Sequence, residues 1–482
     1  MPLGEILLAE DLINEEQIES ALERQKVAGG LLGDNLVALG FITREKLEAI
    51  LQEPPAAPNS IRKTGLDTQF LVNLVLKSAY VSGFQTVPEI SNQIKLSRGI
   101  VEALLQLLKK EGFIEVRGAT DANFAILRHT LTSMGRERAI EALKQSNYIG
   151  PAPIPLEDYQ VQVQKQTVTN ERIGADLLSQ TLSHLILSPE VLQRLGPAIN
   201  SGKAILLYGA SGNGKTSVAE AIGHAFQQTI YIPYCIEVDG QIIKIFDTAL
   251  HKEIPSQPDS ENPHASPIYL RPAEFDPRWV RCRRPVVISG GELTLEMLDL
   301  DFDPLSKYYE APLQVKATGG VFVIDDFGRQ LARPRDLLNR WIVPLERRVD
   351  YLTLHTGKKF DLPFDELVIF STNIPPEELM DAALLRRVHY KLRVDPPTVE
   401  EYKAVFRRIC NLHKLELPED VLSYILNFFY PKNRTSLAAF HPKFIVEHAI
   451  AACNYEGIPP RLTHNLVKDA LENLVISQNP SP

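Results

Sequence analysis

The eight residues GASGNGKT, at positions 209–216, constrain the fold of this 482-residue chain more than any other stretch. They fit the pattern G-x-x-x-x-G-K-[ST] and lie between the apolar run AILLY and a helix expected from about Lys215. In this pattern, glycines free backbone N–H groups to surround phosphates, a lysine reaches the β- and γ-phosphates, and a hydroxyl ligates Mg²⁺. A strand before the motif and a helix after it argue against a chance match. The residues predicted to bind the nucleotide here are Gly209, Ala210, Ser211, Gly212, Asn213, Gly214, Lys215, Thr216 and Ser217.

The segment VFVIDD, residues 321–326, ends an apolar strand with two aspartates. Burying carboxylates there costs free energy unless a cation lies beside them, and ligands of open α/β sheets bind at the carboxyl ends of the strands. Asp325 is therefore predicted to hold Mg²⁺ together with Thr216, directly or through water. Asp326 is predicted to polarise the attacking water, and the alternative is an N-cap of the helix that follows.

Two later motifs add polar groups to strand and helix ends. LVIFSTN ends a buried strand with Asn373, whose amide either orients a water at the γ-phosphate or forms a turn. AALLRRVHY places Arg386 and Arg387 at the close of a helix. An arginine there either binds the last-turn carbonyls or reaches the γ-phosphate of a neighbouring subunit as an arginine finger.

From about Thr169, predicted strands alternate with helices, which indicates a parallel sheet wrapped in helices. These strands are AILLYG, TIYIPYCIEV, PVVISG, VFVIDD and LVIFSTN, and the chain is helical after about Pro396. The fold class expected is therefore multidomain, with an α/β core and an α-helical lid. The predicted parts are a small helical repeat domain (1–53), a linker (54–65), a winged-helix α+β domain (66–147), a proline-rich linker (148–168), the core (169–395, with a mobile loop at 251–267) and the lid (396–482).

The N-terminal domain is an internal repeat with an offset of 29 residues. The two copies read LGEILLAEDLINEEQIESAL and LGDNLVALGFITREKLEAIL. Each copy predicts a short helix, a tight turn and a second helix that begins after Asn14 or Thr43, both good N-caps. Residues 1–53 hold 11 acidic and 4 basic side chains, a net charge of −7.

The predicted winged helix is mildly basic, because residues 60–145 hold 12 basic and 8 acidic side chains. Its third helix could bind DNA, but the basic residues there are only Arg98, Lys109 and Lys110, and the apolar positions are mostly core. Protein contact or oligomer organisation is therefore favoured over sequence readout, with DNA binding as the alternative.

Cysteine spacing and hydropathy indicate the cellular compartment of the protein. The four cysteines lie far apart with no C-x-x-C pair, which is typical of reduced thiols and not of metal ligands. No stretch approaches the roughly 18 apolar residues that span a membrane. We expect a cytoplasmic protein without membrane insertion.

The order of these motifs resembles that of the AAA+ ATPases, nearest to bacterial chaperone-like members akin to the MoxR group, over roughly residues 169–475. The positions that match Walker A, Walker B and sensor 1 are Lys215 with Thr216, Asp325 with Asp326, and Asn373. Arg386 and Arg387 match the arginine-finger position without showing which one acts. Ile173 and Gly174 resemble the short adenine-side box that precedes the P-loop.

The resemblance implies ATP and Mg²⁺ as ligands, a ring that is typically a hexamer, and remodelling of a protein partner that is not identified. Two positions depart from the family pattern. Walker B ends Asp-Asp where Asp-Glu is usual, and Lys443 stands where the lid's sensor 2 arginine is expected. A lysine there supplies a point charge without bidentate geometry.

The N-terminal repeat resembles the N-terminal domain of type II secretion and pilus assembly ATPases (the MshEN-like domain), some of which bind cyclic di-GMP. In the ligand-binding version each unit begins Arg-Leu-Gly, whereas Pro2 and Leu31 stand at the arginine positions here. The repeat is therefore expected to be either a protein-docking module or a cyclic di-GMP sensor. Two alternative functions follow: a nucleotide-switched regulator that binds DNA through the winged helix, and a secretion- or pilus-associated ATPase controlled by cyclic di-GMP.

Overall fold

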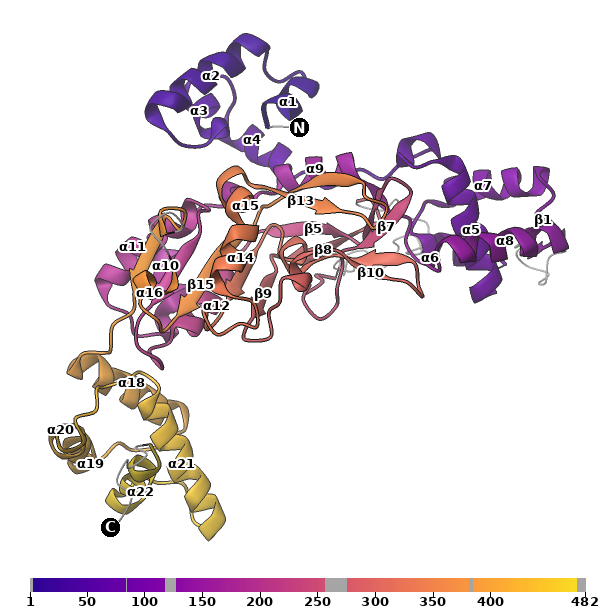
Figure 1. Cartoon of the computed structure of the whole chain (residues 1–482). Helices are drawn as coiled ribbons and strands as arrows, with labels where there is room; N and C mark the ends of the chain where they lie inside the picture. Colours follow the sequence, from indigo (N-terminus) through magenta and orange to yellow (C-terminus); the bar gives the residue numbers. More distant parts are fainter. Residues whose placement is uncertain (1–2, 84, 118–126, 256–274, 381–384, 475–482) are drawn as a thin grey trace, which may run out of the picture.

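The computed structural model describes residues 3–83, 85–117, 127–255, 275–380 and 385–474. Figure 1 shows an α/β core in the middle of the molecule. The N-terminal helices lie over one side of this core, a second helical unit lies at one end, and the C-terminal helices lie beyond the other end.

The core is built on five parallel strands in the order β16-β4-β15-β12-β9. They are β16 (Tyr390–Arg393), β4 (Ile205–Tyr208), β15 (Leu367–Thr372), β12 (Val321–Ile324) and β9 (Val286–Ser289). Ile324 pairs with Phe370, and Thr372 pairs with Tyr208. The carboxyl ends of β4, β12 and β15 therefore meet at one edge, where the predicted phosphate, metal and water-orienting residues follow.

Alternate side chains of these strands enter two separate cores, as the two-residue period of a strand requires. Ile205, Val323 and Ile369 pack with α10 (Ala175–Thr181), α11 (Pro189–Asn200) and α12 (Lys215–Ala225) on one face. Leu206, Phe322 and Phe370 pack on the other face, near α14 (Pro334–Arg340) and α15 (Ile342–Arg347). The sheet is therefore covered by helices on both faces, which confirms the mixed α/β core with a parallel sheet.

The sequence interpretation of TIYIPYCIEV as one strand of this sheet is wrong. It forms β5 (Thr229–Pro233) and β6 (Cys235–Val238), which belong to different sheets. The break falls at Tyr234, directly after Pro233, the last residue of β5, which has no N–H to donate to a ladder. The edge strand β16 was not predicted, because its half-exposed charged residues do not make an apolar run.

The residues between α12 and β12 form most of a second layer of strands. A mixed sheet has the order β10-β11-β7-β6-β3. Its strands besides β6 are β10 (Asp301–Asp303), β11 (Tyr308–Glu310), β7 (Gln241–Lys244) and β3 (Ile154–Pro155). Beside it lie α13 (Leu313–Lys316) and two antiparallel pairs, β5 with β8 (Trp279–Arg283) and β13 (Val349–Thr353) with β14 (Lys359–Pro363).

The prediction that residues 148–168 are a proline-rich linker is wrong. They contain β3, which pairs with β6, and α9 (Leu156–Lys165). Ile154, Tyr159 and Val163 are buried in the core of the second layer. This packing overrides the spacer-like composition, because the apolar residues at a helical spacing in α9 bury one face.

The predicted loop 251–267 begins in fixed structure. His251 is buried, and its Nε2 lies 2.8 Å from the carbonyl oxygen of Lys316. Residues 256–267 of that prediction lie outside the described residues.

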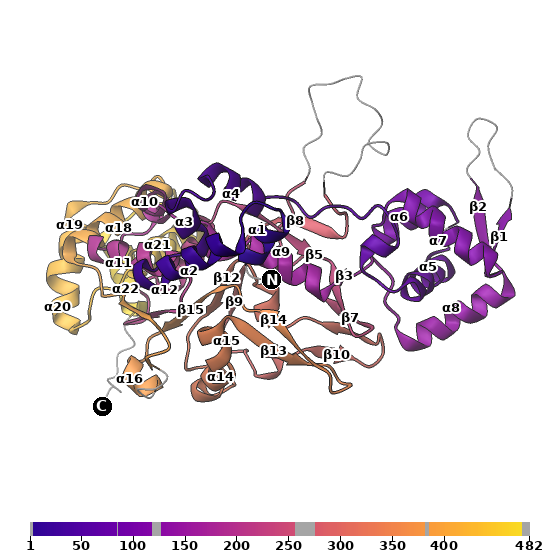
Figure 2. The ribbon, with the colours of Figure 1, turned by 90° about the horizontal axis from the view of Figure 1, so that it is seen from above.

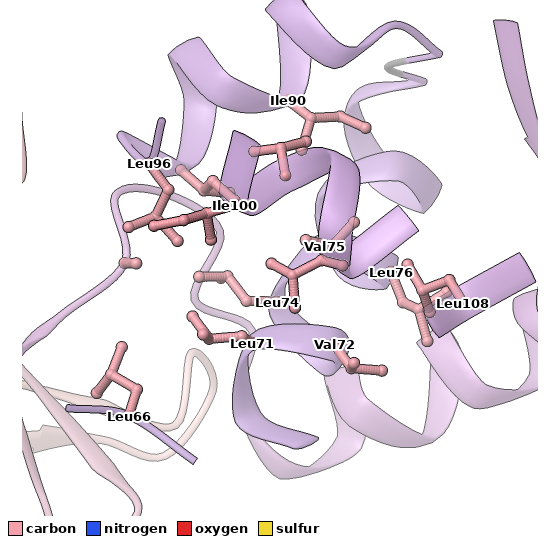
Figure 3. Packing of buried hydrophobic residues seen from close by; sticks show 14 of the residues in the cluster. Leu66, Leu71, Val72, Leu74, Val75, Leu76, Ile90, Leu96, Ile100 and Leu108 are labelled. Atoms are coloured by element: carbon pink, nitrogen blue, oxygen red, sulfur yellow. The ribbon is translucent and has the colours of Figure 1, made fainter. Parts of the chain in front are cut away.

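The unit at residues 66–147 has three helices, an antiparallel strand pair and a fourth helix. These are α5 (Thr68–Ser82), α6 (Val87–Ile94), α7 (Arg98–Lys110), β1 (Ile114–Arg117), β2 (Arg128–Leu131) and α8 (Ser133–Gln145). Figure 3 shows Val75 of α5, Ile90 of α6 and Ile100 of α7 in one apolar core. Cys235 of β6 and Ile242 of β7 join the same core, so this unit packs on the second layer.

A buried ion pair holds both ends of this unit. Arg278 and Asp276 are each 3% exposed and lie 2.8 Å apart. Arg278 Nη1 also donates to the carbonyl oxygens of Thr64, 3.2 Å away, and Pro153, 3.1 Å away. The predicted linker at 54–65 is therefore anchored at its end, where Thr64 is buried.

The N-terminal repeat forms α1 (Leu3–Ala9), α2 (Glu15–Ala28), α3 (Leu32–Ala38) and α4 (Arg44–Leu51). Asn14 and Thr43 cap α2 and α4 through side-chain acceptors. The core contains the repeat-related pairs Leu7 with Leu36 and Ile13 with Ile42.

The chain after β16 is helical as far as it is described. Its helices are α18 (Val399–Leu412), α19 (Glu419–Tyr424), α20 (Tyr430–Asn433), α21 (His441–Glu456) and α22 (His464–Leu474). They share an apolar core of their own that includes Tyr402, Phe406 and Ile445. Within the described ranges, no helix has the length and apolarity that a membrane crossing requires.

Candidate nucleotide-binding site

The loop 209–214 joins β4 to α12 and turns at glycines that no other residue could replace without strain. Gly214 precedes α12 with φ of +82°, in the left-handed region that favours glycine. A Cβ at Gly209 would lie 2.3 Å from the carbonyl oxygen of Val394, which follows β16. The glycines of the motif therefore fix the backbone that a phosphate would approach.

Lys215 begins α12 and folds its side chain back over this loop. Its Nζ donates to the carbonyl oxygens of Gly209, 3.1 Å away, and Ala210, 3.0 Å away. Burial lowers the pKa of Lys215, whereas the carboxylates of Asp326 and Asp325 act to raise it. The loop therefore holds the Lys215 ammonium close to the place where the phosphate oxygens of a nucleotide are expected to bind.

The two predicted metal ligands lie in contact. Thr216 Oγ1 is 2.9 Å from both Oδ1 and Oδ2 of Asp325. The backbone N–H of Asp325 donates to Ser289 at the end of β9, at 2.9 Å, which fixes the aspartate at the sheet edge. A hydroxyl and a carboxylate are hard oxygen donors of the kind that Mg²⁺ binds, so the donor set fits this ion.

Asp326 lies in an exposed turn and does not cap a helix. Its φ is +48°, and its carbonyl oxygen accepts from the N–H of Arg329 at 2.9 Å. The next helix, α14, begins only at Pro334. The N-cap alternative is therefore wrong, because the chain turns left-handed at Asp326 and remains non-helical for seven residues.

Asn373 follows β15 between the loop and the aspartates. Its Oδ1 is buried and has no hydrogen-bond partner among the described residues. The local turn is made by Thr372 instead, whose Oγ1 accepts from the N–H of Ile374 at 3.1 Å and donates to Phe327 O at 2.7 Å. A buried acceptor without a partner costs about 1–3 kcal/mol, and a water at the phosphates would supply the missing donor.

The two arginines of the LLRR motif differ in their surroundings. Arg387 Nε donates to Glu346 of α15 at 2.8 Å, and its side chain is 17% exposed. Arg386 is exposed and makes no ion pair with any residue that the structure describes. Within these residues neither side chain bonds to the P-loop of its own chain.

The predicted adenine-side box is fixed by a residue that sequence reasoning missed. The side chain of Asn200, at the end of α11, accepts from the N–H of Ile173 at 2.8 Å and donates to its carbonyl oxygen at 3.0 Å. Ile173 is buried, and Gly174 is the extended N-cap residue of α10. No motif in the sequence marks Asn200, which stands 27 residues from its partner.

The lid reaches the loop through residues other than the predicted Lys443. The Lys443 side chain is 67% exposed and pairs with Glu447 on the same helix at 3.8 Å. Instead, the N–H of Phe440 donates to Gly212 O at 3.0 Å, and the N–H of Ala439 donates to Asn213 Oδ1 at 3.4 Å. The lid supplies backbone N–H groups to both contacts, just before α21, so no side-chain motif of the lid could have predicted them.

This chain was compared with family models, with curated proteins and with solved structures. A family model described as a domain of unknown function (DUF8689) matches residues 398–473, within the lid. No curated protein matches the chain. Among solved structures, the chain is similar to NtrX from Brucella abortus, with 14% identity, a TM-score of 0.35, 64% of this chain covered and 55% of that chain.

Two further solved structures show likenesses of the same size. Domain III of the Thermotoga maritima replication initiation protein DnaA is 12% identical with a TM-score of 0.33, covering 61% of this chain and 96% of its own. The Thermotoga maritima RuvB Holliday junction branch migration motor is 17% identical with a TM-score of 0.31, covering 63% and 70%. These likenesses do not identify an activity or a partner for this chain.

Proposed function

We propose that this chain is a Mg²⁺-dependent AAA+ ATPase that assembles into a ring and uses ATP hydrolysis to remodel a protein partner. The observation that carries the proposal is the contact of Thr216 with both carboxylate oxygens of Asp325, directly behind the loop 209–214. Two hard oxygen donors beside a phosphate-binding loop, at the carboxyl edge of a parallel sheet, suit a magnesium nucleotide.

In this proposal, each residue around this pair has its own role in phosphoryl transfer. The loop N–H groups and Lys215 bind phosphate oxygens, while Thr216 and Asp325 supply protein ligands for Mg²⁺. Bound Mg²⁺ neutralises charge on the β- and γ-phosphates. Asp326 polarises the attacking water, and Asn373 orients it through its buried Oδ1.

The arginine finger completes the site from a neighbouring subunit in this proposal. Arg386 is the residue suited to the role, because Arg387 is engaged by Glu346 within its own chain. A site that needs this charge from another copy is active only in an oligomer, which supports a ring. The N-terminal units and the second strand layer would select the protein partner.

Removing the metal ligand tests the magnesium site directly. Asp325→Asn is expected to raise the Mg²⁺ concentration for half-maximal ATP hydrolysis by at least about tenfold, because one anionic ligand is lost. Phosphate release would be measured across a Mg²⁺ titration, with EDTA abolishing it. Asp336→Asn, at an exposed aspartate of α14, is the matched control. An unchanged Mg²⁺ requirement in Asp325→Asn would refute the assignment.

The role of Asp326 is tested by a variant that binds ATP without cleaving it. Asp326→Asn is expected to keep ATP affinity while hydrolysis falls by about 10²–10⁴-fold, the usual contribution of a general base. Such a variant should retain its protein partner in ATP but not in ADP, which an affinity pull-down with Asp326→Asn would detect. Hydrolysis at the wild-type rate would exclude Asp326 as the base.

A further inference from the structure

The residues 165–173, here called the coupling strip, lie between the N-terminal repeat and the nucleotide-binding core. Figures 1 and 2 show the helices α1–α4 over the side of the core that carries α9, and α1 contacts α9. Lys165, at the end of α9, pairs with Glu53 at 3.0 Å. Arg172 pairs with Asp34 of α3. Both ends of the strip are thus bound by acidic residues of the repeat.

The opposite side of the same strip is tied to the elements of the nucleotide site. Glu171 accepts hydrogen bonds from the N–H groups of Gln227 and Gln228, which follow α12. It also forms a buried pair with Arg284 at 2.8 Å. Arg284 Nη1 in turn donates to Gly319, just before β12, at 2.6 Å. The strip therefore contacts the residues that follow the P-loop helix, and through Arg284 it is linked to Gly319, which lies before the strand that leads to Asp325.

The backbone conformation explains how the coupling strip contacts both the repeat and the core. Glu171 has φ of −91° and ψ of 114°, an extended conformation in which successive side chains point in opposite directions. Glu171 accordingly enters the core, Arg172 meets the repeat, and Ile173 returns to the core, where Asn200 holds it. Arg172, which the repeat binds, therefore directly precedes the predicted adenine-side box, Ile173 and Gly174.

The ion pairs on the two sides of the coupling strip differ in burial, and therefore in strength. Arg284 and Glu171 are buried, whereas the Arg172 side chain is 62% exposed and Glu53 is 55% exposed. Exposed ion pairs are weak and are screened by salt. The contact with the repeat can therefore open and close at low cost, and each opening removes one restraint on the backbone at Arg172.

We infer that the N-terminal repeat is an internal regulatory domain whose binding partner is the coupling strip of its own chain, and that docking slows nucleotide release. This inference rests on the proposed function and adds the regulation of the same site. It also gives the second repeat copy a role, because Asp34 of that copy binds Arg172.

The test compares nucleotide release from full-length variants. Arg172→Gln and Asp34→Asn are expected to release a fluorescent ADP analogue about two- to fivefold faster than the wild type, the effect of losing one exposed pair. Asp34 also binds Arg44 at 2.8 Å, so Arg172→Gln is the cleaner variant. Raising the salt concentration should speed release from the wild type toward the rate of these variants.

The repeat supplies a matched control. Glu5 occupies in the first copy the position that Asp34 occupies in the second, and it makes no ion pair with the described residues. Glu5→Gln should release the analogue at the wild-type rate. Amide hydrogen exchange without nucleotide gives a second measurement, in which residues 165–173 should exchange faster in Arg172→Gln and not in Glu5→Gln.

The possible failures are distinguishable. Equal release rates in the wild type and both docking variants, with analogue binding intact, would overturn this inference alone. Failure of the wild type to bind the analogue at all would overturn the proposed function, and the regulation with it. Unchanged exchange at residues 165–173 in Arg172→Gln would show that the repeat does not hold the strip.

Discussion

Lys215→Ala is expected to reduce ATP hydrolysis by about 10²–10³-fold, because it removes a preorganised charge that acts on the transferring phosphate. The ammonium already lies inside the loop, bound to Gly209 and Ala210. The Lys215 side chain is already buried, so part of the cost of removing its charge from water is met before any nucleotide binds. The lysine side chain therefore needs little rearrangement when phosphate oxygens replace the carbonyl oxygens of Gly209 and Ala210 as its acceptors.

The measurement is phosphate release at saturating ATP and Mg²⁺, with ATP affinity measured separately. Lys203→Ala is the matched control, since Lys203 is exposed and lies just before β4. A Lys215→Ala protein that hydrolyses ATP at the wild-type rate would remove the basis of the proposed function.

Arg386→Ala is expected to lower kcat by about 10³–10⁵-fold, the range for removal of an arginine finger. Arg387→Ala is the matched control, because the two residues are adjacent and equal in charge. Loss of the Arg387 pair with Glu346 is expected to cost only about 0–1 kcal/mol of stability. Hydrolysis by Arg387→Ala should therefore stay near the wild-type rate.

A mixing experiment tests whether Arg386 acts across a subunit boundary. Lys215→Ala and Arg386→Ala proteins should each be inactive alone, yet a mixture should recover part of the activity. Some boundaries in a mixed ring combine an intact loop from one subunit with an intact arginine from the next. If mixing recovers nothing, or if Arg387→Ala is the inactive variant, the finger has been assigned to the wrong residue or the wrong chain.

The sequence predicts the centre of this site because its information is local. GASGNGKT fixes a loop conformation through its own glycines, and VFVIDD joins a buried strand to the predicted metal ligand Asp325 within six residues. The structure then brings Thr216 and Asp325 together across 109 residues, because β4 and β12, the strands that precede them, end at the same edge of one parallel sheet with β15 between them.

What the sequence does not predict depends on distant contacts. Residues 148–168 have the prolines of a spacer, but Tyr159 and Val163 find an apolar core that strands far along the chain complete. Asn200 and Thr372 act through hydrogen bonds to backbone groups, and the lid contact of Phe440 is itself made by the backbone. Such contacts leave no residue pattern, because one partner in each is a backbone group, which nearly every residue has.

The buried Arg278 has a mechanical consequence. It holds Thr64, where the chain enters the unit at residues 66–147, and Pro153, where the chain leaves it. A unit attached by two free linkers could turn in any direction, but this one is fastened at both crossings to the same side chain. Any shift of the second strand layer would therefore move the entry and the exit of the α5–α8 unit together.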